Sequence, residues 1–180
     1  AEELVRRKLG EFVYSRNGEG LEAVAGGLLL STGKTVACAE SCTGGLLSQR
    51  LTSIPGSSAY FLEGVVAYGN RAKVRRLGVP QRSIDGNGAV SPPVAEAMAR
   101  GVRARSGADL GLAVTGIAGP GGGSEDKPVG LVFTALAWKG GVSVERNLFR
   151  GTREIVRSQA AQKALDMLRR RLLLELGEGT

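Results

Sequence analysis

Residues 35–47 have the side chains and the spacing that nucleophilic chemistry needs. A short apolar run leads to Ser41, then to Thr43, then to Gly44 and Gly45, before a new apolar periodicity begins. This order predicts a strand, a tight turn and the start of a helix. Such a turn leaves backbone N–H groups that can bind an anion or a developing oxyanion. We therefore expect Ser41 to act as a nucleophile, with the amides of Thr43, Gly44 and Gly45 facing the substrate.

Two other interpretations of this turn are open. In the first, the hydroxyl groups merely cap the helix that follows. The glycine pair favours a ligand instead, because small residues let a ligand reach the backbone amides. In the second, Cys42 is the nucleophile. We favour Ser41, because a neighbouring residue in a turn generally points elsewhere and partly buried cysteine is commonly inert packing.

The sequence contains no histidine, so a catalytic serine here cannot use a Ser-His-Asp arrangement. Lysine is the leading candidate for the base. Lys73 falls on a short helix directly after a strand that ends at Tyr68. Burial and neighbouring arginines would lower the pKa of Lys73, and Tyr68 could orient or relay the proton. This role requires Lys73 to lie near Ser41 rather than in solvent, where most helical lysines lie.

Composition limits the class of protein. A chain of 180 residues, 42% hydrophobic and 23% charged, predicts one globular domain, and no apolar stretch is long enough to cross a membrane. The net charge of +7 suits a small phosphorylated substrate. Aromatic residues make up 4% and no nucleic-acid motif is present, so we expect no nucleic-acid partner.

The two cysteines, Cys38 and Cys42, cannot form a disulfide framework, and without histidine they cannot complete a structural zinc site. The first residues lack the features of a secretory signal. Together these observations predict a cytoplasmic protein.

The pattern of apolar residues predicts a three-layer α/β/α fold with a mostly parallel sheet and an antiparallel edge hairpin. Residues 1–20 resemble a linker of the kind that follows an upstream domain, and residues 21–180 are expected to form the domain. Strands are expected at 35–39, 60–68, 110–115, 129–138 and 142–149, and helices at 21–33, from 46, around Lys73, at 91–107 and at 152–176. A helical pattern also occurs within residues 2–14.

Ligands in such sheets bind beyond the carboxyl ends of the strands. The Ser41 turn and the glycine-rich loop of residues 116–128 would both lie there, so we expect them to share one cleft. Glycine-rich backbone amides and an arginine would suit a substrate phosphate, and either glycine-rich segment could hold it.

Six segments, in the expected order, make a resemblance specific: residues 39–45, 55–58, 68–73, 88–91, 115–120 and 122–130. From Leu21 to Leu172 the chain resembles the CinA carboxy-terminal domain family, whose members include bacterial nicotinamide-nucleotide amidohydrolases. The resemblance implies hydrolysis of the carboxamide of nicotinamide mononucleotide to nicotinate mononucleotide and ammonia, in pyridine-nucleotide recycling. It implies no metal or organic cofactor, and a homodimer.

Transferred to this sequence, the family's nucleophile is Ser41, its base is Lys73 and its assisting residue is Tyr68. Thr115, Gly116 and Arg153 are expected to contact the substrate. Arg150 and Arg157 are alternatives to Arg153, which follows Gly-Thr where the family commonly has Gly-Asp.

Two other functions are open. The chain could be a phosphometabolite-binding or regulatory domain that kept the pocket without turnover. A DNA-associated protein of competence or damage response would need steeply salt-dependent DNA binding.

Overall fold

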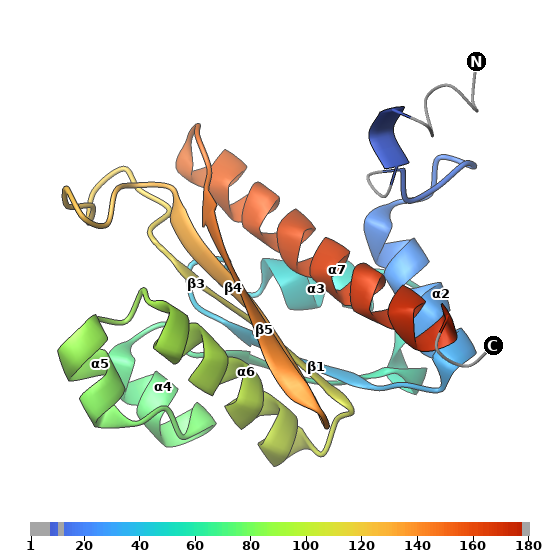
Figure 1. The fold of residues 1–180 in the computed structure, drawn as a ribbon, viewed down its shortest axis with the longest axis horizontal. Helices are drawn as coiled ribbons and strands as arrows, with labels where there is room; N and C mark the ends of the chain where they lie inside the picture. The colour runs from blue at the N-terminus through green and yellow to red at the C-terminus, as the bar shows by residue number, and fades with distance from the viewer. Residues whose placement is uncertain (1–7, 11–12, 178–180) are drawn as a thin grey trace.

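A five-stranded mixed sheet forms the centre of the molecule (Figure 1). The structure, a computed structural model, describes residues 8–10 and 13–177. The strand order is β2-β1-β3-β4-β5, with bounds β1 Val36–Glu40, β2 Phe61–Val66, β3 Leu110–Gly116, β4 Leu131–Trp138 and β5 Gly141–Leu148. Strands β2 and β3 run parallel to β1, whereas β4 pairs antiparallel with β3 and β5 pairs antiparallel with β4. The α/β fold and its edge hairpin are as expected, and the parallel part of the sheet is limited to three strands.

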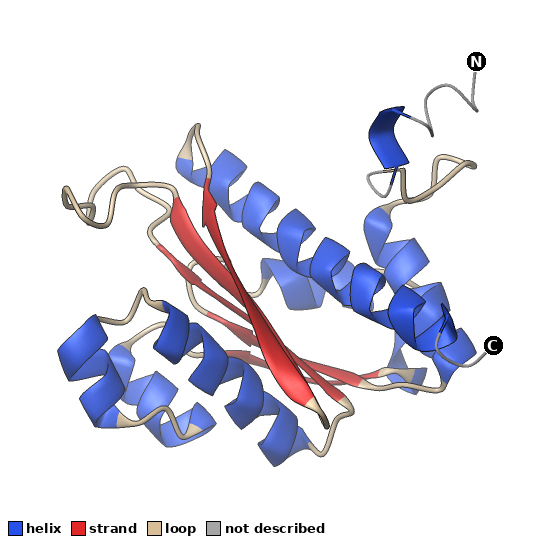
Figure 2. Ribbon diagram, in the orientation of Figure 1, coloured by secondary structure: helices blue, strands red, loops and turns tan. Residues whose placement is uncertain are grey.

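Helices cover both faces of the sheet and give three layers (Figure 2). One face carries α2 Leu21–Thr32, α3 Leu46–Thr52 and α7 Arg153–Gly177; the other carries α4 Asn70–Leu77, α5 Gln81–Asn87 and α6 Pro92–Ser106. A short 3-10 helix, Ser57–Ala59, leads into β2. The helical pattern expected within residues 2–14 lies largely outside the described residues.

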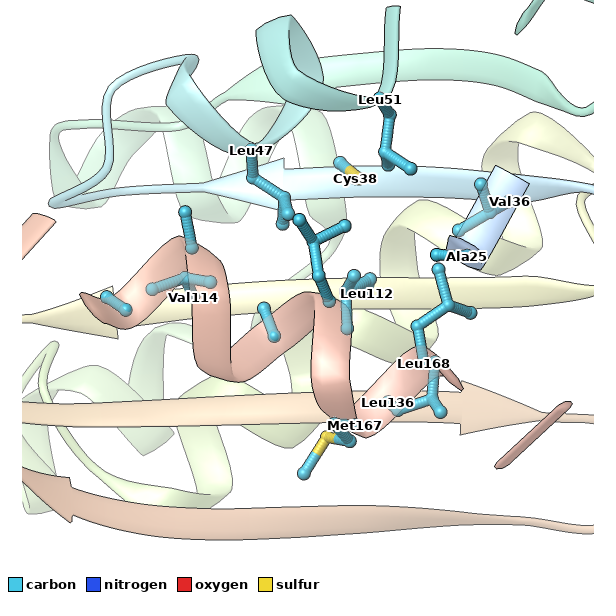
Figure 3. Packing of buried hydrophobic residues seen from close by; sticks show 14 of the residues in the cluster. Ala25, Val36, Cys38, Leu47, Leu51, Leu112, Val114, Leu136, Met167 and Leu168 are labelled. Atoms are coloured by element: carbon cyan, nitrogen blue, oxygen red, sulfur yellow. The ribbon is translucent and has the colours of Figure 1, made fainter. Parts of the chain in front are cut away.

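Strand β1 is buried on both sides, and its alternation decides where the next residues point. Val36 and Cys38 pack into the core beneath α2, α3 and α7 (Figure 3), whereas Ala37 and Ala39 pack into the core on the α6 side. Continuing this alternation directs Glu40 towards α3 and Ser41 towards the face that carries α4.

Helix α4 is fixed by close packing on α6. A Cβ atom at Gly101 of α6 would overlap the carbonyl oxygen of Leu77, the last residue of α4. Glycine therefore lets the two helices approach each other at this point. The position of α4 matters because Lys73 lies in its middle turn.

The three parallel strands end at the same edge of the sheet. Ser41 follows β1, Tyr68 follows β2 by one residue, and Thr115 and Gly116 end β3. The fold thus gathers the predicted chemical groups at one edge, as expected for carboxyl strand ends. Within residues 8–10 and 13–177, no helix is long and apolar enough to cross a membrane.

Candidate active site

Ser41 and Lys73 meet at the carboxyl edge of the sheet. The Lys73 Nζ atom lies 3.0 Å from the Ser41 Oγ atom. Both side chains are buried, with 8% of Ser41 and 1% of Lys73 exposed. Ser41 is held by its own amide, which donates to the carbonyl oxygen of Val114 in β3.

Three oxygen atoms surround the Lys73 amine, a set that suits a neutral amine as well as an ammonium group. Besides Ser41, Nζ contacts the carbonyl oxygens of Ala67 at 2.9 Å and of Tyr68 at 3.0 Å. A neutral amine has two N–H donors for the two carbonyls and one lone pair, which then faces the serine hydroxyl. Burial lowers the pKa of Lys73, against a smaller opposing effect of Cys42, and no carboxylate of the described residues forms an ion pair with it.

Glu40 holds the turn in place from the α3 side of the sheet. Its side chain is fully buried and its carboxylate accepts hydrogen bonds from the amides of Gly45, Leu47 and Ser48 and from the Ser48 hydroxyl. The carboxylate thereby satisfies the N–H groups at the start of α3. Glu40 is a functional residue that the predictions above do not include, although an acidic residue just before a predicted helix start is a signal for such a role.

This arrangement corrects the predicted role of the turn amides. The Gly44 amide donates to the Ser41 carbonyl and the Gly45 amide donates to Glu40, so neither is available to a substrate. Thr43 is fully buried and its Oγ1 atom has no hydrogen-bond partner among the described residues. Within the part of the chain that the structure describes, the amides of Cys42 and Thr43 donate to no oxygen.

A pocket of about 290 Å³ opens at the pair formed by Ser41 and Lys73, which we call the dyad. Of the turn residues, Ser41 and Cys42 line it, whereas Thr43, Gly44 and Gly45 do not, because Glu40 draws the chain into α3. The other lining residues are Tyr68, Asn70, Lys73, Ala89, Val90, Thr115, Gly116, Ile117, Ala118, Gly119, Gly121, Gly122 and Arg153. We call this cavity the Ser41 pocket. The sequence does not mark Asn70, Ala89 or Val90 as pocket residues, because none of them carries a reactive group.

Arg153 and Tyr68 meet at the Ser41 pocket. One Arg153 nitrogen donates to the Tyr68 hydroxyl and another to the Gly119 carbonyl, both at 2.9 Å. Tyr68 is 58% exposed, so its hydroxyl contacts Arg153 rather than the dyad. Arg157 instead donates to the Thr43 carbonyl, and neither it nor Arg150 lines the pocket. Geometry therefore favours Arg153 among the three arginines.

Thr115 and Gly116 form part of the pocket wall. The Thr115 hydroxyl donates to the Ala89 carbonyl at 2.9 Å, which joins β3 to the segment before α6. A Cβ at Gly116 would lie 2.6 Å from the Val132 side chain and 2.8 Å from the Leu131 carbonyl. Only glycine therefore fits where β3 enters the loop.

Cys42 is poorly suited to nucleophilic attack. It is 5% exposed, and burial, partly opposed by nearby backbone N–H groups, raises the pKa of its thiol to about 11. A thiol that stays protonated is a weak nucleophile. Cys38 is also buried, and burial raises its thiol pKa well above the ordinary range.

The model of the CinA C-terminal domain matches residues 18–172. The chain belongs to the CinA C-terminal domain family. A CinA-like protein of Geobacter metallireducens is 56% identical over 170 residues, which cover 94% of this chain and 41% of that protein. The chain thus spans about two fifths of the length of such relatives.

Solved structures of the CinA family share the fold. The competence/damage inducible protein CihA of Agrobacterium tumefaciens is 42% identical, with a TM-score of 0.79 over 83% of this chain and 94% of that chain. The competence damage-inducible protein A of Klebsiella pneumoniae is 35% identical, with a TM-score of 0.82 over 85% of this chain and 95% of that chain. These likenesses establish the family and its α/β fold.

Proposed function

We propose that this chain hydrolyses the carboxamide of nicotinamide mononucleotide, releasing ammonia and nicotinate mononucleotide. The observation that carries the proposal is the 3.0 Å contact between a buried lysine amine and a buried serine hydroxyl in a pocket. An amide is a poor electrophile with a poor leaving group. Its hydrolysis needs a nucleophile, a base that can later act as an acid, and oxyanion donors.

The first half-reaction uses the dyad. The Ser41 Oγ atom attacks the carboxamide carbon while the neutral Lys73 amine takes the hydroxyl proton. The oxygen of the tetrahedral intermediate then carries the negative charge. We expect the amide of Cys42, the residue after the nucleophile, to donate to this oxygen, as the corresponding amide does in other nucleophile turns. Lys73 returns the proton to the departing nitrogen, the C–N bond breaks, and ammonia leaves an acyl-serine ester.

The second half-reaction regenerates the enzyme. A water molecule attacks the ester carbon while Lys73 takes its proton. The bond to Ser41 breaks as the proton passes to the Ser41 oxygen, and the nicotinate carboxylate is released. The two carbonyls of Ala67 and Tyr68 keep the amine in place through both steps.

The nucleotide part of the substrate needs an anion site at the pocket. Arg153 offers a guanidinium there, and two of its five N–H groups are used by Tyr68 and Gly119. The remaining donors suit a phosphate. Tyr68 then contributes to this arginine site rather than relaying a proton for Ser41.

Ammonia release tests the proposal. We expect the chain to release ammonia from nicotinamide mononucleotide, and Ser41→Ala to lower the rate by at least about a thousandfold with the circular dichroism spectrum unchanged. Ser31→Ala on α2, which precedes β1 and so lies towards the other edge of the sheet, is the matched control and should keep full activity. Equal rates in Ser41→Ala and the wild type would refute the mechanism. Saturable binding without product would favour a binding domain.

A further inference from the structure

The loop between β3 and β4, residues 117–130, forms one wall of the Ser41 pocket. Gly119, Gly121 and Gly122 line the pocket from this loop. The loop is closed at its base, where the Ile117 amide donates to the Leu131 carbonyl and the Gly130 amide donates to the Ile117 carbonyl. Beyond this base the loop extends from the end of the sheet (Figure 1).

A second wall comes from the segment that joins α5 to α6. Three consecutive carbonyl groups of this segment each accept a hydrogen bond from a side chain. The Ser91 hydroxyl donates to the Gly88 carbonyl and the Thr115 hydroxyl donates to the Ala89 carbonyl, both at 2.9 Å. Ala89 also lines the pocket. The segment is therefore fixed on α6 and on β3.

The third of these carbonyls belongs to Asn87 and accepts its hydrogen bond from the glycine-rich loop. The donor is the Nζ atom of Lys127, 40 residues further along the chain. Asn87 is the last residue of α5, where helix carbonyls are unpaired and a cation is favourable. A Cβ at Gly88 would lie 2.8 Å from the Lys127 Nζ atom, so glycine leaves room for the ammonium group.

We propose that Lys127 is a positioning residue that holds the two walls of the Ser41 pocket together for substrate binding. Lys127 fixes the positions of the loop glycines and of Ala89 and Val90 in the pocket wall. Ser41, after β1, and Lys73, on α4, are held by contacts that do not involve Lys127. Loss of Lys127 therefore weakens substrate binding and leaves the chemical step nearly unchanged. The kinetic form of this inference rests on the proposed function.

Kinetics and hydrogen exchange together test the contact between Lys127 and the Asn87 carbonyl, which we call the tether. Lys127→Met keeps the length of the side chain and removes its donors. We expect a roughly tenfold rise in KM for nicotinamide mononucleotide, the value of a lost charged hydrogen bond, with kcat changed less than about twofold. Lys127→Arg restores donors and should recover much of the KM. Lys139→Met, in the tip of the β4–β5 hairpin, is the matched control and should match the wild type.

Hydrogen exchange of the ligand-free chain separates this proposal from the proposed function. In Lys127→Met, amides of residues 118–123 and 87–90 should exchange faster, and those of β1 and α7 should not. If the wild type releases no ammonia, this measurement still decides whether the tether exists. Unchanged KM in Lys127→Met, or faster exchange spread evenly over the molecule, would overturn the proposal.

Discussion

At the scale of single residues, the proposed mechanism depends on an uncharged Lys73 amine. Lys73 is 1% exposed, and two carbonyl oxygens occupy the N–H donors of its neutral form. A charged partner would stabilise the ammonium form, and the described residues place no carboxylate within ion-pair distance of it. Burial without a counter-ion thus favours the neutral form of Lys73, which the proposed role as a base requires.

The rate should depend on pH through Lys73. Its pKa is lowered from the ordinary value of 10.5 by burial, and only the neutral amine can accept the Ser41 proton. We expect kcat/KM to rise with pH and to level off below pH 10.5. Lys73→Arg should be inactive at every pH, because an arginine stays charged. A pH profile of ammonia release measures both, and a flat profile would contradict the role of Lys73.

The free energy of unfolding should also depend on pH through Lys73. Between the lowered pKa of the folded chain and 10.5, the unfolded chain binds more protons at Lys73 than the folded chain does. The free energy of unfolding therefore rises with pH across this interval, and this contribution is absent below it. Lys73→Met should lose this part of the pH dependence in urea unfolding.

Glu40 should contribute strongly to stability through the Ser41 turn. In Glu40→Gln, the amide nitrogen cannot accept the hydrogen bonds that one carboxylate oxygen now accepts, and buried N–H donors are left unpaired. We expect the free energy of unfolding to fall by about 3 kcal/mol in urea titrations. Glu63→Gln, on the exposed edge strand, is the control, and an equal change in both variants would contradict this role.

Single residues differ in how far the sequence predicts them. Ser41 is predictable because a serine followed by small residues between a strand and a helix is a local pattern. The hydrogen bonds of Gly44 and Gly45 are not predictable in this way. The Gly44 amide donates to the Ser41 carbonyl, and the Gly45 amide donates to Glu40, whose direction depends on how β1 alternates beneath α3. The distance between Ser41 and Lys73 depends on the pairing of β1 with β2, which no local pattern encodes.

At the scale of elements, the long periodic segments and the short helices α3 and α4 follow from the sequence, whereas α5 does not. The buried strands β1, β3 and β4 read as apolar runs, and α7 was placed within one residue at each end. Helix α5 was missed because its seven residues bury only Ile84. The sheet contains two antiparallel pairings because the loop after β3 carries no crossover helix, so β4 must return beside β3.

The contact between α4 and α6 gives a prediction at this scale. Gly101→Ala should push α4 away from α6 and lower the free energy of unfolding by about 1–3 kcal/mol, the usual cost of overpacking. Because α4 carries Lys73, kcat should fall as well. Gly27→Ala in α2 is the matched control. Its Cβ meets nothing within 4 Å, so it should raise stability by about 0.5–1 kcal/mol. Urea unfolding of both variants measures the difference, and equal effects would contradict the close approach.

At the scale of the whole molecule, net charge should influence substrate capture. The chain carries a net charge of +7, which attracts an anionic substrate over distances that salt screens. We expect kcat/KM for nicotinamide mononucleotide to fall about threefold between 0.05 and 0.5 M salt. Nicotinamide riboside, which lacks the phosphate, is the matched compound and should show no such fall. Identical salt dependence for both would indicate that the phosphate is not sensed.

The fold class was predictable from the order of elements, and the family comparison supports it independently. A homodimer stays a prediction, to be measured by sedimentation. The exposed leucines Leu173, Leu174 and Leu176 near the end of α7 are where we would look for its interface.

The burial of both native thiols has a practical consequence for spectroscopy. Cys38 and Cys42 are the only cysteines in the sequence, and both are shielded and kept protonated in the folded chain. A maleimide dye reacts with exposed thiolates, so it should spare them. A cysteine introduced at an exposed position such as Glu125 would then take the dye selectively, in an otherwise unaltered background.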